Sequence, residues 1–78
     1  MNDNSSITNG IALMSAIRHN DFEAVYELVW YGYNISFNDL KHALRAATMR
    51  HTIQQDCYDI VVLLDRITRR REALVRAS

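Results

Sequence analysis

The sequence predicts an all-α domain of four helices, and three observations support this. Apolar residues recur at helical spacing along almost the whole chain, and no sustained apolar–polar alternation bounded by turn residues indicates a strand. Proline is absent, and the only glycines are Gly10 and Gly32. With 78 residues, of which 49% are hydrophobic, the chain can form one small core but not two domains.

The first nine residues differ in composition from the rest. Residues 1–9 are polar and rich in Asn and Ser, so we expect a flexible N-terminal arm there. A single helical domain over residues 10–78 should follow. Its first helix is predicted from about Gly10 to Arg18, with Leu13, Ala16 and Ile17 on the buried face.

Three further helix starts share one local pattern, in which a capping side chain precedes an acidic residue of the first turn by three positions. The pairs are Asn20 with Glu23, Ser36 with Asp39, and Asp56 with Asp59. They predict helices over about 21–31, 37–51 and 57–76. Gly32 should end the first of these as a left-handed cap. The expected inward residues are Phe22, Val25, Leu28, Val29, Leu40, Ala43, Leu44, Ala47, Ile60, Val61, Leu63, Leu64 and Ile67.

The helices form two pairs with similar sequence patterns. Leu13–Ile17 aligns with Leu44–Thr48 at an offset of 31 residues, and Phe22–Val25 aligns with Tyr58–Val61 at an offset of 36. Two antiparallel helical hairpins account for this repeat. The last helix, at about twenty residues or roughly 30 Å, is longer than a compact bundle needs, so its end could project toward a partner.

At these residues the chain resembles an ankyrin repeat. The first unit carries the resemblance at Ala12-Leu13, Ala16, Asn20–Val25, Leu28-Val29 and Gly32–Ile35, and the second at Leu44, Ala47 and Tyr58–Leu64. The resemblance covers about residues 11–66 and implies stacked hairpins that bind proteins without catalysis. Ile11–Met14 stands where the family has Thr-Pro-Leu-His, and two repeats are fewer than the roughly three that a stable stack needs. A small helical bundle with convergent spacing is the alternative.

Composition excludes several classes of function. One cysteine, Cys57, cannot form an internal disulfide, which favours a reducing, cytoplasmic compartment. The N-terminus lacks the features of a secretory signal, and the longest apolar run, Ile60–Leu64, has five residues, so we expect no membrane span. The histidines and Cys57 lack metal-ligand spacing, and no Gly-rich phosphate loop occurs. We therefore predict no enzyme, catalytic residue, cofactor or metal site.

Two groups of residues are candidates for binding. Five of the seven aromatic residues fall between Tyr26 and Phe37, and they either seal the small core or form an exposed interface. The candidate protein-binding residues are Tyr26, Trp30, Tyr31, Tyr33 and Phe37. The second group either ends a solvated helix or contacts an acidic partner or phosphate. Its members are Arg66, Arg69, Arg70, Arg71 and Arg76.

The net charge of zero conceals a separation of charge along the chain. Residues 1–40 hold five acids and one base, and residues 41–78 hold eight bases and four acids. The zero balance argues against a polybasic nucleic-acid binder. Asp56 and Asp59 at the start of the last helix argue against that helix recognising DNA. Self-association of the acidic half with the basic half is one expectation, which would give a homodimer or a larger homo-oligomer.

The sequence thus predicts a non-enzymatic protein-binding module, a small inhibitor or adaptor that docks on a larger protein. Its size and lack of motifs are typical of small inhibitors made by phages and mobile elements, including those directed at bacterial defence systems, which is an analogy of class alone. The alternatives are an accessory protein that contacts nucleic acid through the Arg-rich C-terminal helix, and a structural homo-oligomer.

Overall fold

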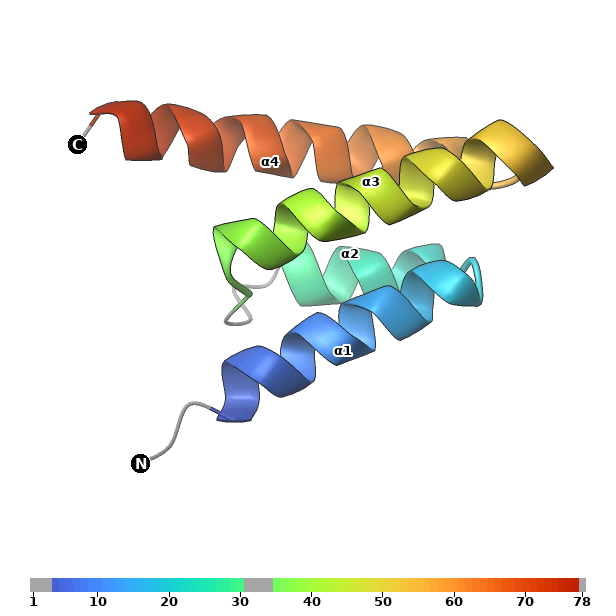
Figure 1. Ribbon diagram of the computed structural model, residues 1–78, viewed down its shortest axis with the longest axis horizontal. Coiled ribbons are helices and arrows are strands. Elements are labelled where there is room, and N and C mark those ends of the chain that lie inside the picture. Colours follow the sequence, from blue (N-terminus) through green and yellow to red (C-terminus); the bar gives the residue numbers. More distant parts are fainter. Residues whose placement is uncertain (1–3, 31–34, 78) are drawn as a thin grey trace.

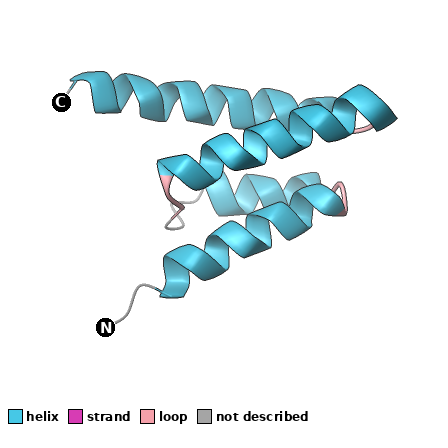
Figure 2. Ribbon diagram, in the orientation of Figure 1, coloured by secondary structure: helices cyan, strands magenta, loops and turns pink. Residues whose placement is uncertain are grey.

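The computed structural model describes residues 4–30 and 35–77, and these are helical apart from short connections (Figures 1 and 2). The helices are α1 (Asn4–Arg18), α2 (Phe22–Trp30), α3 (Phe37–Gln54) and α4 (Tyr58–Ala77). No strand occurs within the described ranges, so the predicted all-α class is confirmed. None of the helices described has both the length and the apolar character needed to cross a membrane.

The four helices form two antiparallel hairpins that stack side by side, as the sequence repeat predicts. In Figure 1, α1 and α2 form the lower hairpin, and α3 and α4 form the upper one. Helix α1 packs against α3, and α2 packs against α4. Each stacked pair runs in the same direction (Figure 1). The radius of gyration, 12.2 Å, is close to the roughly 11.5 Å expected for a compact chain of this length.

The core lies where the four helices meet. Leu13, Val25, Leu40, Ile60 and Leu64 are fully buried, so every helix contributes at least one such side chain. The inward residues named above all belong to the core cluster or pack against it. Helical periodicity therefore identifies the inward face of each helix correctly. The expectation that the inward pattern resumes at Leu74 and Val75 is wrong, because both are exposed.

The first helix begins earlier than predicted. Helix α1 starts at Asn4, so the predicted start near Gly10 is wrong, and residues 4–9, expected in the arm, are helical. Asn and Ser are unfavourable inside a helix but suit its first turn, where the backbone N–H groups have no partner within the helix. Gly10 lies within α1, where the helix backbone comes close to the Asp39 side chain of α3. A Cβ added to Gly10 would lie 2.5 Å from Oδ2 of Asp39.

One of the three predicted N-caps is confirmed. Ser36 Oγ accepts a hydrogen bond from the backbone N–H of Asp39 at 3.0 Å. Asn20 is not the cap of α2, because it has a left-handed backbone (φ 54°) and Asp21 Oδ1 accepts from Ala24 N–H instead. Cys57, not Asp56, stands at the start of α4, where its carbonyl accepts from Val61 N–H. The predicted cap at Gly32 lies outside the described residues.

Helix α3 also ends later than predicted. It continues to Gln54, three residues beyond His51, and Gln55 then adopts a left-handed backbone with φ 55°. The N–H of Gln55 donates to the carbonyl of His51 at 2.7 Å, which satisfies a carbonyl of the last turn. Sequence patterns assign this capping role to glycine, whereas here a glutamine fills it. The end of α3 was therefore not predictable from the sequence pattern.

Candidate functional site

The candidate site is a groove between α2 and α4, which we call the aromatic groove. It is an open hollow of about 500 Å³. Phe22, Tyr26 and Trp30 of α2 form one wall, and the other comes from α4. The residues of the α4 wall are Tyr58, Asp59, Val62, Leu63 and Arg66. The groove exists because the two hairpins stack with α2 beside α4.

The α2 wall is a row of three neighbouring aromatic rings, of which Tyr26 and Trp30 are stacked. Phe22, Tyr26 and Trp30 are spaced by four residues, which puts them on one face of the helix. The ring centroids of Phe22 and Tyr26 lie 6.0 Å apart, and those of Tyr26 and Trp30 lie 5.6 Å apart with the rings 18° from parallel. Trp30 remains 46% exposed. Rings held by one another in this way lose little freedom when a partner covers them.

The α4 wall is a stripe with the same four-residue spacing, and it extends beyond the aromatic groove. Tyr58 and Val62 are 68% and 37% exposed. Past Trp30 lies a second hollow of about 270 Å³, which Arg70 and Leu74 line together with Trp30. The stripe Tyr58, Val62, Arg66, Arg70 and Leu74 therefore follows both hollows. It spans about 24 Å along the helix.

The predicted arginine group divides into two kinds. Arg69 pairs with Asp65 (Nε to Oδ2, 3.0 Å), and Arg76 pairs with Glu72 (3.1 Å). Arg71 Nη2 donates to the carbonyl of Ile35 at 3.0 Å, so it ties α4 to the segment before α3. Arg66 and Arg70 make no ion pair with any residue in the described ranges. Arg66 lines the aromatic groove, and Arg70 lines the second hollow together with the bonded Arg71.

Acidic residues lie on the opposite side of the aromatic row. Glu23 and Glu27 are exposed on α2 and line a hollow of about 340 Å³ together with Phe22 and Tyr26. The rings thus form a ridge with two glutamates on one flank and, on the other, the α4 wall, which carries Arg66 and Arg70 and, near its start, Asp59. A ligand seated on this face meets a gradient of charge across the groove, not a uniform potential.

The predicted aromatic residues are only partly brought together. Tyr26 and Trp30 lie in the groove, whereas half-buried Phe37 lies in the first turn of α3, with Lys41 Nζ 5.4 Å from its ring centroid. Tyr31 and Tyr33 fall outside the described residues. Sequence reasoning missed Tyr58 and Val62. The repeat alignment pairs Phe22 with Tyr58, and stacked hairpins bring such equivalent positions together. The alignment could therefore have identified Tyr58 as a residue of the site.

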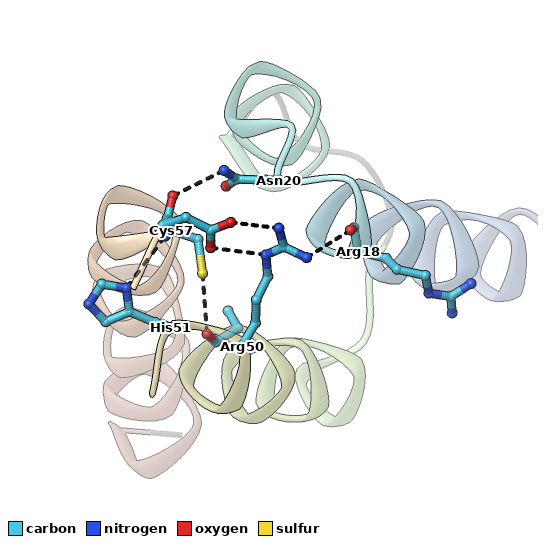
Figure 3. Close-up of polar contacts among 7 residues, drawn as sticks. Arg18, Asn20, Arg50, His51 and Cys57 are labelled. Atoms are coloured by element: carbon cyan, nitrogen blue, oxygen red, sulfur yellow. Dashed lines mark hydrogen bonds and ion pairs between the residues drawn. The ribbon is translucent and has the colours of Figure 1, made fainter. Parts of the chain in front are cut away.

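A cluster of polar contacts, which we call the polar clasp, joins the two interhelical turns (Figure 3). Two hydrogen bonds run from Arg50 to the Asp56 carboxylate, at 3.1 Å from Nε and 2.6 Å from Nη2. Arg50 Nη1 also donates to the carbonyl of Arg18, and Asn20 Nδ2 donates to the carbonyl of Asp56, both at 3.0 Å. Arg50 and Asn20 therefore link the α1–α2 turn to the end of α3 and the start of α4.

The titration behaviour of the clasp follows from these contacts. The hydrogen bonds from Arg50 hold the pKa of Asp56 below its ordinary value, because they stabilise the carboxylate. Burial, with the nearby Asp56 charge, raises the pKa of the Cys57 thiol. That thiol donates to the carbonyl of Ala47 at 3.4 Å. A buried thiol with a raised pKa stays protonated at neutral pH, so packing accounts for Cys57 and a nucleophilic role does not.

A further apolar hollow lies between α1 and α3. It measures about 290 Å³, and its lining includes Met14, Ile17 and Ile53, of which Ile53 is 78% exposed. It has no aromatic side chain, and the two arginines that line it are Arg18 and Arg50. Arg50 is engaged in the clasp, whereas the Arg18 side chain makes no ion pair with any described residue. The lack of aromatic side chains therefore makes this hollow the weaker candidate. Within the described ranges, no three His, Cys, Asp or Glu side chains lie close enough together to hold a metal ion.

Comparison of the chain with protein-family models, with curated proteins and with solved structures finds no match. The ankyrin resemblance therefore stays a prediction.

Proposed function

We propose that this chain is a non-enzymatic protein-binding module, a small inhibitor or adaptor that docks on a larger protein through the aromatic groove. The observation that carries the proposal is the row of neighbouring rings along an open hollow, formed by Phe22, Tyr26 and Trp30. Trp and Tyr are the residue types that most often dominate protein–protein binding energy, and they do so from partly enclosed positions of this kind.

Exposure separates this proposal from the view that the aromatic residues only seal the core. A sealing residue should be largely buried, yet Trp30 is 46% and Tyr58 is 68% exposed. The fully buried side chains of this region are aliphatic, Val25, Ile60 and Leu64. The exposed parts of the Trp30 and Tyr58 rings therefore lie outside the core and can contact a partner.

The chain is large enough to offer a standard interface on one face. Such an interface buries about 800 Å² on each partner. That is about one-seventh of the 5553 Å² accessible surface of this chain. The proposed interface has the aromatic groove at its centre and extends onto the surface around it.

The proposal can be tested by photo-crosslinking. Benzoylphenylalanine placed at Val62, in the groove, is compared with the same group at Ile53, on the α1–α3 side, in nuclease-treated lysate of the organism that makes the protein. We expect a discrete protein adduct from position 62 and none from position 53. Unlabelled wild-type protein in excess should abolish the adduct, and the Trp30→Ala variant at the same excess should not.

Three outcomes would overturn the proposal. An adduct that forms equally from both positions would show non-specific contact. An adduct that appears only when nuclease is omitted would favour a nucleic-acid partner. An adduct with a second copy of this chain alone would favour the structural homo-oligomer. Circular dichroism of the Trp30→Ala variant confirms that the competitor is folded.

A further inference from the structure

We infer that the segment bound in the aromatic groove is an acidic amphipathic helix whose carboxylates pair with Arg66 and Arg70. This inference rests on the proposed function and specifies the chemistry of the partner. It starts from the contrast between these two arginines and the others of α4, which already have acceptors within the chain.

The sequence places no acidic residue three or four positions away from Arg66 or Arg70 on their own helix. Positions three and four residues away from either of them carry apolar residues or another arginine. Arg69, by contrast, has Asp65 four residues before it, and Arg76 has Glu72, and both of those pairs form. Arg66 and Arg70 are themselves four residues apart, an arrangement in which like charges weaken a helix slightly. A partner that supplies carboxylates would remove this repulsion.

The positions of the two arginines fix where the acidic residues of the partner should be. Arg66 lines the hollow on one side of Trp30, and Arg70 lines the hollow on the other. One helical turn, about 6 Å, separates them along α4. Carboxylates at positions i and i+4 of a partner helix have the same separation. Each guanidinium can donate two parallel hydrogen bonds to one carboxylate.

The rest of the face suits an amphipathic helix. The ridge of Phe22, Tyr26 and Trp30 offers a row of rings at helical spacing. On the α4 stripe, Val62 adds an apolar contact before the two arginines and Leu74 adds one after them. The stripe is about 24 Å long, which corresponds to about sixteen residues of helix. A helix laid in such a groove presents anchors at every third or fourth residue.

The acidic flank distinguishes a peptide from a nucleic acid. Glu23 and Glu27 lie on the far side of the aromatic ridge, and Asp59 lies in the groove itself. A phosphate backbone carries negative charge along its whole length and would be repelled by these three carboxylates. A helix can confine its acids to the part of its α4-facing flank that lies opposite Arg66 and Arg70, so it meets the arginines without meeting the glutamates or Asp59, which lies seven residues before Arg66.

The test is a selection from a displayed library of sixteen-residue helical peptides, randomised on one face, against the intact chain. We expect peptides whose binding requires Trp30 to be enriched in Asp or Glu at pairs of positions four apart. For one such peptide, the Arg66→Gln/Arg70→Gln variant should bind at least about tenfold more weakly, the loss expected when two charge-assisted contacts are removed. The matched control, Arg69→Gln/Arg76→Gln, should bind within about twofold of wild type.

A charge reversal makes the assignment specific. The Arg66→Glu/Arg70→Glu variant should reject the acidic peptide and bind the same peptide with its acids replaced by lysine. All four arginines are on the surface of α4, and circular dichroism checks that each variant is folded.

The possible failures are distinguishable. Peptides that need Trp30 but show no acidic enrichment would overturn this inference and leave the proposed function standing. Selected peptides that bind the Trp30→Ala variant as well as wild type would overturn both. A twenty-nucleotide single-stranded DNA that binds the wild type and loses binding in Arg66→Gln/Arg70→Gln would replace the acidic helix with a nucleic acid as the ligand of these arginines.

Discussion

The polar clasp and the aromatic groove use the same side chain in opposite ways. In the clasp, Arg50 directs three of its nitrogens at two acceptors within the chain, the Asp56 carboxylate and the Arg18 carbonyl. In the groove, Arg66 and Arg70 have no ion-pair partner among the described residues, and both border hollows that Trp30 also lines. The difference teaches that residue type alone does not mark a binding arginine. The presence or absence of an acid within reach does.

The largest expected effect separates binding from stability in the groove. Trp30→Ala should weaken partner binding by about 2 kcal/mol or more, roughly thirtyfold, as truncation of a central hot-spot residue does. The thermal midpoint should change little, because Trp30 is nearly half exposed. Calorimetric titration and a thermal melt measure the two quantities. Ile53→Ala, on the other side of the molecule, is the control and should alter neither. A large fall in the midpoint for Trp30→Ala would make this residue a core seal instead.

The next largest effect is expected for Asn20 of the polar clasp, whose replacement should lower stability and leave partner binding nearly unchanged. Asn20→Ala should lower the free energy of unfolding by about 2 kcal/mol, about half from the left-handed backbone and half from the hydrogen bond to Asp56. Asn20→Gly should cost only about 1 kcal/mol, because glycine adopts the left-handed conformation without strain. Urea unfolding gives both values, and peptide binding should stay within about twofold. Equal losses for the two variants would mean that the backbone conformation contributes nothing.

The smallest effect expected is on the pH dependence of the free energy of unfolding. The folded-state pKa of Asp56 is depressed, so its contribution to stability is complete above the ordinary carboxyl pKa of about 4 and is lost as the pH falls through the lower folded-state value. Arg50→Gln removes the cause of that depression. We expect wild type to lose more stability than Arg50→Gln between about pH 5 and pH 3, measured by urea unfolding at each pH. Parallel losses would show that the Arg50–Asp56 pair does not stabilise the fold.

Helical spacing predicted the four helices and their inward faces, because burial of apolar side chains determines both. It failed at helix ends, where several acceptors compete for the same donors. Asn20 and Asp56 both have side chains suited to capping, yet Asn20 donates to the Asp56 carbonyl and Asp56 accepts from Arg50. These contacts join residues 36 and six positions apart. A local sequence pattern cannot show whether a side chain will make such a tertiary contact or will cap the helix that follows it.

The sequence predicted the α2 side of the candidate site and missed the apolar residues on the α4 side. Tyr26 and Trp30 were found because they share a face of one helix, which sequence spacing reveals directly. Tyr58 and Val62 become part of the site only when α4 packs beside α2, which is a property of the tertiary fold. The distinction among the arginines could have been drawn from sequence, since Asp65 and Glu72 lie at the spacing that pairs with Arg69 and Arg76 and with neither Arg66 nor Arg70.

The polar clasp also bears on the lifetime of the folded chain. Its two contacts between the hairpins, Arg50 to Arg18 and Asn20 to Asp56, join residues 32 and 36 positions apart. Each hairpin closes over a short turn and so forms quickly, whereas contacts between hairpins come with docking. Interactions that are absent from the folding transition state act mainly on the rate of unfolding. We therefore expect the clasp to affect how long the two hairpins remain docked, and with them the groove, more than how fast they find each other.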